Sequence, residues 1–158
     1  MANIEMRKRL RHHWADLFKL VAELERYPEF VPCCQRTRVL SRTADGPDRT
    51  VIVSRMTVGI SALHVSYANR TVADLSKRQI SVDAIDGPLR YLNVLWTFNP
   101  DGDEWTEVGF AVSYEFSNPV LGALASGPFD SMFRQILEAF ERRADQLFLR
   151  VSCTQAHR

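Results

Sequence analysis

The sequence has few cysteines and no long apolar run, and both absences narrow the classes of protein it can belong to. Cys33 and Cys34 are adjacent and Cys153 lies near the end, so neither a disulfide framework nor a Cys-x-x-Cys zinc site is indicated. The histidines have no metal-ligand spacing either. We expect buried or half-buried thiols and no metal site. No apolar run approaches the roughly 18 residues that span a bilayer, and residues 1–10 lack a signal-peptide core, so we expect a cytoplasmic protein.

The chain also lacks an excess of either charge. Its 20 Lys and Arg residues balance 19 Asp and Glu residues, for a net charge of +1, so DNA is not expected as a partner. One local basic cluster exists, made of Arg7, Lys8, Arg9, Arg11, His12 and His13. It can contact ribosomal RNA or anionic lipid, but a solvated strand edge is the interpretation we favour.

Recognisable catalytic motifs are missing as well. There is no Gly-x-Ser-x-Gly, no phosphate loop and no dinucleotide fingerprint. His64 lies between apolar neighbours on an alternating strand and is expected to face solvent. Glu107 and Glu115 fall on the polar face of their strand, so Tyr114 is the best polar group on the inner face. We predict no catalytic residue.

What the sequence does contain is the pattern of one globular domain over residues 1–150, followed by a tail at 151–158. An apolar spacing typical of an amphipathic helix runs from Trp14 to Val21. A second short helix is expected over 24–30, bracketed and stopped by Pro28 and Pro32. Asn118–Pro119 is a favourable start for a long final helix, which Gly127–Pro128 should break or kink.

Between the helices, alternating apolar residues separated by turn signals predict an antiparallel meander. The expected strands cover residues 4–10, 38–43, 49–58, 63–72, 80–84, 94–98 and 108–116, with turns at 44–48, 86–88 and 99–103. The loop at 59–62 carries Ile60 at its tip. We expect a plain hairpin there rather than a flap or a membrane contact. The fold class is therefore α+β, a curved sheet of six or seven strands wrapped around the C-terminal helix.

The inward residues of this arrangement are largely aromatic, and two outcomes are open: a fully packed core, or a cavity that binds a small apolar ligand. If the cavity exists, its ligand-binding residues are predicted to be Phe30, Trp96, Phe98, Phe110, Val112, Tyr114, Phe129, Met132, Phe133, Ile136 and Phe140.

The order of elements resembles the helix-grip, START-like fold, and two stretches sharpen the resemblance. The segment Leu20–Cys34, with Tyr-Pro-Glu-Phe-Val-Pro, is the first; Tyr114–Pro119 running into Ala139–Ala144 is the second. Both are similar to the polyketide cyclase/dehydrase-type family, which includes coenzyme-Q-binding proteins and RatA-type ribosome-association toxins. The chain departs from the family at Cys33, where a Trp is usual, and at Asn69, where a Ser is common.

The resemblance implies a carrier or chaperone that binds ubiquinone or a similar isoprenoid quinone and supports respiratory electron transport, with no covalent cofactor. It implies two alternatives. One is a toxin that binds the large ribosomal subunit and blocks subunit association; the other is a cyclase or aromatase. The expected partner is a hydrophobic small molecule, with a membrane surface or the ribosome as further candidates and the periphery of the inner membrane as an alternative location.

Overall fold

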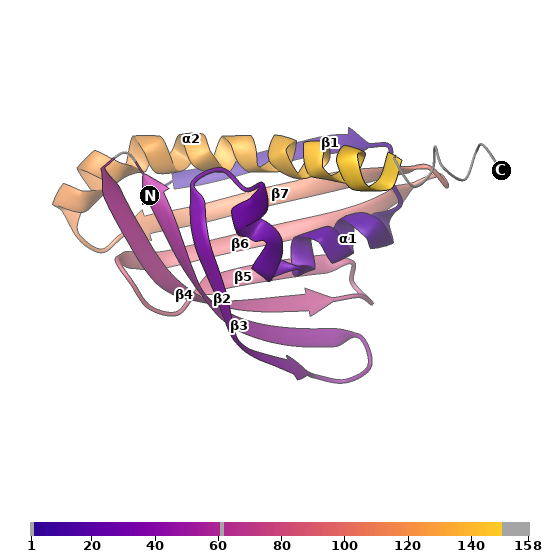
Figure 1. Ribbon diagram of the computed structural model, residues 1–158, viewed down its shortest axis with the longest axis horizontal. Coiled ribbons are helices and arrows are strands. Elements are labelled where there is room, and N and C mark those ends of the chain that lie inside the picture. Colours follow the sequence, from indigo (N-terminus) through magenta and orange to yellow (C-terminus); the bar gives the residue numbers. More distant parts are fainter. Residues whose placement is uncertain (1, 61, 150–158) are drawn as a thin grey trace.

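The computed structural model describes residues 2–60 and 62–149, and its main feature is a curved antiparallel sheet packed against one long helix (Figure 1). The strands are β1 (Ala2–Leu10), β2 (Cys34–Ala44), β3 (Arg49–Ile60), β4 (Leu63–Asp74), β5 (Gln79–Ala84), β6 (Leu89–Asp101) and β7 (Trp105–Phe116). The helices are α1 (Trp14–Ala22), the 3-10 helix η1 (Leu24–Glu29), α2 (Pro119–Ala144) and the π-helical turn η2 (Asp145–Leu149). The order β1-β7-β6-β5-β4-β3-β2 confirms the predicted α+β helix-grip fold with a sheet of seven strands.

Local sequence explains where these elements begin and turn. The side chain of Asn118 accepts hydrogen bonds from the backbone N–H of Val120 (2.8 Å) and Leu121 (3.3 Å), so it caps α2 as predicted. Gly87 has φ +100°, and a Cβ there would lie 2.7 Å from the Cβ of Tyr67. The turn between β5 and β6 therefore requires glycine.

Three prolines behave differently from the sequence-based expectation. Pro28 lies inside η1 instead of stopping it, and η1 ends at Glu29. Pro128 lies inside α2, which continues to Ala144 without the backbone hydrogen bond that proline removes, and the residue after it, Phe129, is buried. Pro100 lies within β6, where the turn was expected. It is tolerated because the pairing of β5 with β6 ends at Thr97, so no neighbour on that side needs its N–H.

The core forms where α2 covers β6 and β7. Ring centroids lie 5.0 Å apart for Phe129 and Tyr114, 6.4 Å for Phe133 and Phe110, and 5.0 Å for Phe140 and Trp96. These residues are all buried, as predicted. Phe98 differs from the rest of the predicted set, because its ring packs against Phe18 of α1 at 5.6 Å rather than against an aromatic ring of α2. The two helices therefore divide the apolar face of the sheet between them.

Phe140→Ala tests how tightly this layer is packed. The Phe140 ring is 3% exposed and is surrounded by the rings of Tyr27, Phe30 and Trp96. Its removal is expected to lower the free energy of unfolding by about 3–5 kcal/mol, measured by urea denaturation. Leu124→Ala, at an exposed position of the same helix, should change it by less than about 0.5 kcal/mol. Equal effects would contradict the packing described.

Candidate ligand-binding site

A cavity of about 70 Å³ lies between the concave face of the sheet and α2, and we call it the inner cavity. Its walls come from η1 and the residues that follow it, from five strands and from α2. The lining residues are Leu24, Tyr27, Val31, Ser54, Met56, Tyr67, Asn69, Thr71, Val82, Leu92, Val94, Trp96, Phe110, Ile136 and Phe140. None of these described lining residues is an Asp, Glu, Lys, Arg or His, so the site suits an uncharged molecule.

The structure brings four of the eleven predicted site residues to this cavity: Trp96, Phe110, Ile136 and Phe140. Phe30 is half-buried on the outer side of the Phe140 ring, at 4.9 Å. Phe98 packs toward α1. The remaining five lie in the packed core beside the cavity and not in its wall: Val112, Tyr114, Phe129, Met132 and Phe133.

Tyr114 was the polar group expected to face a ligand, and the structure gives it another partner. Its hydroxyl donates to the backbone carbonyl oxygen of Ser126 at 3.0 Å, which ties β7 to α2. Burial raises the pKa of Tyr114 to about 12, so the hydroxyl stays protonated at neutral pH. It therefore serves the packing of the helix on the sheet.

Three polar side chains in the wall of the inner cavity were missed by the sequence analysis. Ser54, Asn69 and Thr71 are 0%, 3% and 0% exposed. Their atoms Ser54 Oγ, Asn69 Oδ1 and Thr71 Oγ1 form no hydrogen bond with any described group of the chain. Ser54 and Asn69 are directly paired between β3 and β4, and Thr71 follows two residues later on the same face. We call these three residues the polar wall.

Two tyrosine hydroxyls also belong to the cavity lining. The Tyr27 hydroxyl donates to the carbonyl oxygen of Val21, whereas the Tyr67 hydroxyl donates to the sulfur of Met56, a weak acceptor at 3.9 Å. Burial raises the pKa of both tyrosines, so both hydroxyls remain protonated. The lining thus offers neutral hydrogen-bonding groups and no general base.

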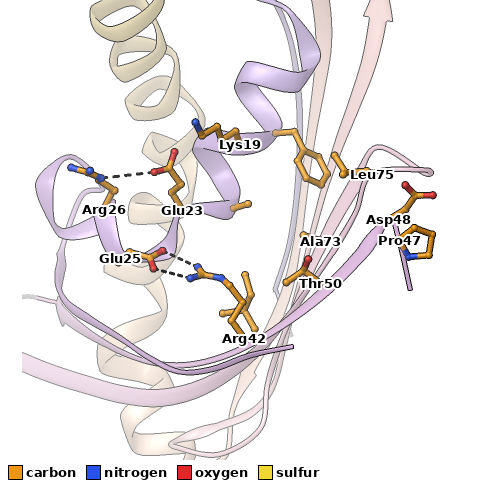
Figure 2. Close-up of a pocket in the computed structure, with 13 residues that line it drawn as sticks. Lys19, Glu23, Glu25, Arg26, Arg42, Pro47, Asp48, Thr50, Ala73 and Leu75 are labelled. Atoms are coloured by element: carbon orange, nitrogen blue, oxygen red, sulfur yellow. Dashed lines mark hydrogen bonds and ion pairs between the residues drawn. The ribbon is translucent and has the colours of Figure 1, made fainter. Parts of the chain in front are cut away.

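A larger hollow of about 500 Å³ lies outside η1, between α1 and the β2–β3 hairpin, and we call it the outer groove (Figure 2). Phe18, Ala22, Ile52, Ala73 and Leu75 give it an apolar floor. Charged side chains from α1, η1 and the hairpin surround that floor.

Ion pairs neutralise much of this rim. Arg42 donates two hydrogen bonds to Glu25, at 3.0 and 3.1 Å, and Arg26 lies 3.9 Å from Glu23 (Figure 2). The hydrogen bonds from Arg42 hold the pKa of Glu25 below its usual value. The groove is therefore apolar below and charge-balanced above.

The inner cavity and the outer groove share one wall. On β3, Ile52 lines the groove and Ser54 lines the cavity; on β4, Ala73 lines the groove and Thr71 lines the cavity. Ile52 and Thr71 are paired neighbours. Leu24 of η1 stands on the cavity side, while its neighbours Glu23 and Glu25 face the groove. The 3-10 helix η1 is thus the partition between the two spaces.

The basic cluster at the N-terminus is largely neutralised by acidic partners. Arg7 pairs with Glu107 (3.4 Å), Arg9 with Asp101 (2.6 Å) and Arg11 with Glu104 (3.4 Å). Lys8 pairs with Glu141 in the same way.

The two histidines of that cluster have structural roles. His12 is buried and bonded to Asp145 at 2.7 Å, and His13 caps α1 through its Nδ1. The arginines and the lysine of the cluster thus lie on an exposed strand edge with acidic partners, the arrangement favoured from the sequence, whereas His12 is buried.

Other sequence-based expectations meet mixed outcomes. Cys34 is buried, and burial raises its pKa, but Cys33 is exposed, at a position where the backbone has φ +63°. Cys153 and the tail at 151–158 lie outside the described residues. His64 is exposed, as expected. The hairpin between β3 and β4 is confirmed, and Ile60 is 2% exposed, so it offers no apolar tip to a membrane. Within residues 2–60 and 62–149, no helix has the length and hydropathy needed to cross a bilayer.

The fold and the cavity place the chain among helix-grip proteins of the START type. A START superfamily protein from Mycobacterium smegmatis superposes with a TM-score of 0.75 at 19% identity, covering 92% of this chain and 98% of that one. The chain belongs to the family described as polyketide cyclase/dehydrase and lipid transport, whose match covers residues 10–141.

Relatives with different names are similar to this chain. The ribosome association toxin RatA of Rickettsia prowazekii is 27% identical over 150 residues, covering 93% of this chain and 99% of its own. The mitochondrial coenzyme Q-binding protein COQ10 homolog B of Xenopus laevis is 28% identical over 137 residues, covering 84% of this chain and 54% of its own. An 18 kDa protein of Caulobacter crescentus superposes with a TM-score of 0.75 at 32% identity, covering 93% and 98%.

Two buried threonines, one with and one without a hydrogen-bond partner, test whether the polar wall contributes to the stability of the fold. Thr106 Oγ1 donates to the carbonyl oxygen of His12 at 2.7 Å, whereas Thr71 Oγ1 has no partner among the described groups. Thr106→Val should lower the free energy of unfolding by about 1–3 kcal/mol. Thr71→Val should leave it unchanged or raise it by up to about 3 kcal/mol, since no protein hydrogen bond is lost and an unpartnered buried hydroxyl is removed. Chemical denaturation of both variants decides, and an equal loss at Thr71 would contradict the geometry.

Proposed function

We propose that this protein binds a neutral hydrophobic ligand with an oxygenated ring, of the isoprenoid quinone type such as ubiquinone, and carries it without changing it chemically. The observation that carries the proposal is an interior cavity with an aromatic wall and three polar atoms without protein partners. The name of the coenzyme Q-binding relative supports the same ligand class. Such a carrier works in the cytoplasm or at the surface of the inner membrane.

The size of the inner cavity means that the ligand ring needs more room. A cavity on the order of 150 Å³ is known to take up a benzene ring, about twice the 70 Å³ available here. The partition η1 is the element whose movement enlarges the cavity, because no strand ladder holds it; Leu24 and Tyr27 anchor its inner side and ion pairs hold its outer side. Arg143 bonds to Glu29 at 2.6 Å and Arg42 bonds to Glu25.

The outer groove supplies the space that a long apolar tail requires. Its volume of about 500 Å³ falls within the range typical of ligand sites, about 300–1,000 Å³. Because the groove and the inner cavity adjoin along β3 and β4, displacement of Leu24 joins them into one channel. The ring then lies inside against Trp96 and Phe110, and the tail lies over Phe18 and Ile52.

A carrier is favoured over a cyclase by the chemistry of the lining. Cyclisation and dehydration of a polyketide need a positioned acid or base. The described lining of the inner cavity has tyrosine, serine, threonine and asparagine as its polar groups, and burial keeps the tyrosines protonated. These groups hold a neutral ligand but do not move its protons at neutral pH.

A second candidate function is binding to the large ribosomal subunit. The similarity to the ribosome association toxin RatA supports it, because the match spans nearly the whole length of both proteins. For this function we propose a surface other than the N-terminal cluster, whose charges have acidic partners. Arg36 and Arg38 of β2 and Arg70 of β4 are exposed and have no ion-pair partner in the described part of the chain. Arg55, beside Arg38 in the sheet, pairs with Asp86. The free arginines offer charge to phosphate groups.

Filling the inner cavity tests the carrier function. Val94 lines the cavity and is 8% exposed, so Val94→Phe should occupy the space that a ligand ring needs. We expect quinone retained after purification, quantified by mass spectrometry per folded protein, to fall at least about tenfold. Val53→Phe, which adds the same ring on the opposite face of β3, should retain as much quinone as the wild type. No quinone in any form, after incubation with quinone-loaded vesicles, would refute the carrier proposal.

Charge reversal tests the ribosomal candidate. Arg36→Glu with Arg38→Glu should weaken co-sedimentation with large ribosomal subunits about tenfold, because favourable phosphate contacts become repulsive. Arg7→Glu with Arg11→Glu makes the same change in net charge on the N-terminal cluster and should have less than about a twofold effect. If the wild type does not sediment with the subunits, this candidate fails; if both double variants lose binding equally, the arginines of β2 are not the interface.

A further inference from the structure

The polar wall is an unusual feature for the interior of a protein. More than about nine in ten buried polar groups have a hydrogen-bond partner. Here three unpartnered atoms, Ser54 Oγ, Asn69 Oδ1 and Thr71 Oγ1, lie on one stretch of β3 and β4 and face one cavity. Because all three side chains are at least 97% buried, bulk water does not satisfy them. Their concentration at one place indicates a ligand group that hydrogen-bonds there.

The aromatic part of the same lining limits what that ligand can be. Trp96, Phe110 and Phe140 provide ring faces and edges, with centroids of Trp96 and Phe110 4.5 Å apart and of Trp96 and Phe140 5.0 Å apart. A molecule in this cavity meets apolar rings as well as the polar wall, so it needs an apolar ring and a hydrogen-bonding atom. It must also be neutral, because the described lining has no charged side chain to compensate a charge.

The chemistry of the three side chains selects the atom. Serine and threonine hydroxyls both donate and accept hydrogen bonds, and an amide offers its oxygen and its N–H₂ group. A carbonyl oxygen of a ligand accepts hydrogen bonds from the Ser54 and Thr71 hydroxyls, whereas the unpartnered Asn69 Oδ1 is itself an acceptor and needs a donor such as a ligand hydroxyl. The Tyr67 hydroxyl, whose partner is a weak sulfur acceptor at 3.9 Å, can turn toward the same oxygen.

We propose that Ser54, Asn69 and Thr71 form an oxygen-recognition site that selects neutral ring ligands carrying a carbonyl or hydroxyl group over hydrocarbons of the same shape. This inference rests on the proposed ligand-binding function and adds the residues that determine its specificity. A site built around hydrogen bonds rejects an analogue without the matching oxygen, because its own buried polar groups then stay unpaired.

Matched probes and matched variants test the proposal. The probes are 2-decyl-1,4-benzoquinone and decylbenzene, which share a ring and a tail and differ in the ring oxygens. Binding is measured as ligand retained through gel filtration over a range of concentrations, quantified by mass spectrometry. We expect the wild type to prefer the quinone about 10- to 100-fold, as one or two hydrogen bonds provide.

The variant Ser54→Ala/Thr71→Val removes both hydroxyls while keeping the shape of the wall, and should reduce the preference to less than about threefold. Asn69→Leu should reduce it in the same direction. The control is Thr57→Val/Ser66→Ala, a directly paired threonine and serine on the outer face of the same two strands, and it should keep the full preference. Circular dichroism compares the folded fractions.

The outcomes separate this inference from the function beneath it. If the wild type and the wall variants bind both probes with the same preference, the oxygen-recognition site is refuted while ligand binding stands. If the wild type binds neither probe, the proposed function fails and the inference fails with it. A preference lost in the wall variants and kept in the outer-face control supports both.

Discussion

The aromatic contact between α2 and the strands β6 and β7 is the interaction on which the rest of the structure depends. A curved sheet with one apolar face is not stable in water until another element covers that face. Phe129, Phe133 and Phe140, spaced along one side of α2, meet inward rings of the sheet. The last of these rings, Phe140, also meets Tyr27 of η1, so η1 adds to the cover of the sheet there. Helix α1 lies beside the same end of α2 (Figure 1).

The way in which α2, α1 and η1 together cover the sheet explains where the cavity lies. It also explains why the sequence predicted the fold better than the site. Strict alternation in β7 and the helical spacing in α2 are local signals, so the strands, the helix and the buried rings follow from them. The cavity depends on which inward positions are not filled. Ser54, Asn69 and Thr71 occupy inward positions in the same alternation as Ile52 and Ala73. Polar residues at inward positions of alternating strands were the feature of the sequence from which the site could have been predicted.

The charged residues show a second property that local sequence patterns do not predict, namely which charges are paired in the folded protein. The basic residues near the N-terminus pair with acidic residues that are more than ninety residues later in the sequence. They meet because β1 pairs with β7 at the edge of the sheet. Arg36, Arg38 and Arg70 are scattered along the sequence but come together on the outer face of β2–β4. Which positive charges are free to meet a partner is therefore a property of strand order, which periodicity alone does not specify.

The location of the polar wall also follows from the stability of the chain as a whole. Buried polar atoms without partners cost about 1–3 kcal/mol each, a large share of the 5–15 kcal/mol by which a domain of this size is stable. They persist only in a structure whose remaining contacts are strong, and here the ring cluster between β7 and the first half of α2 supplies those contacts. The polar wall lines the same cavity as Leu24 and Tyr27 of η1, whose buried side chains hold this helix on its inner side while ion pairs hold it on its outer side. Polar groups without partners beside a short helix that no strand ladder holds are the combination that lets a ligand enter and gain free energy by entering.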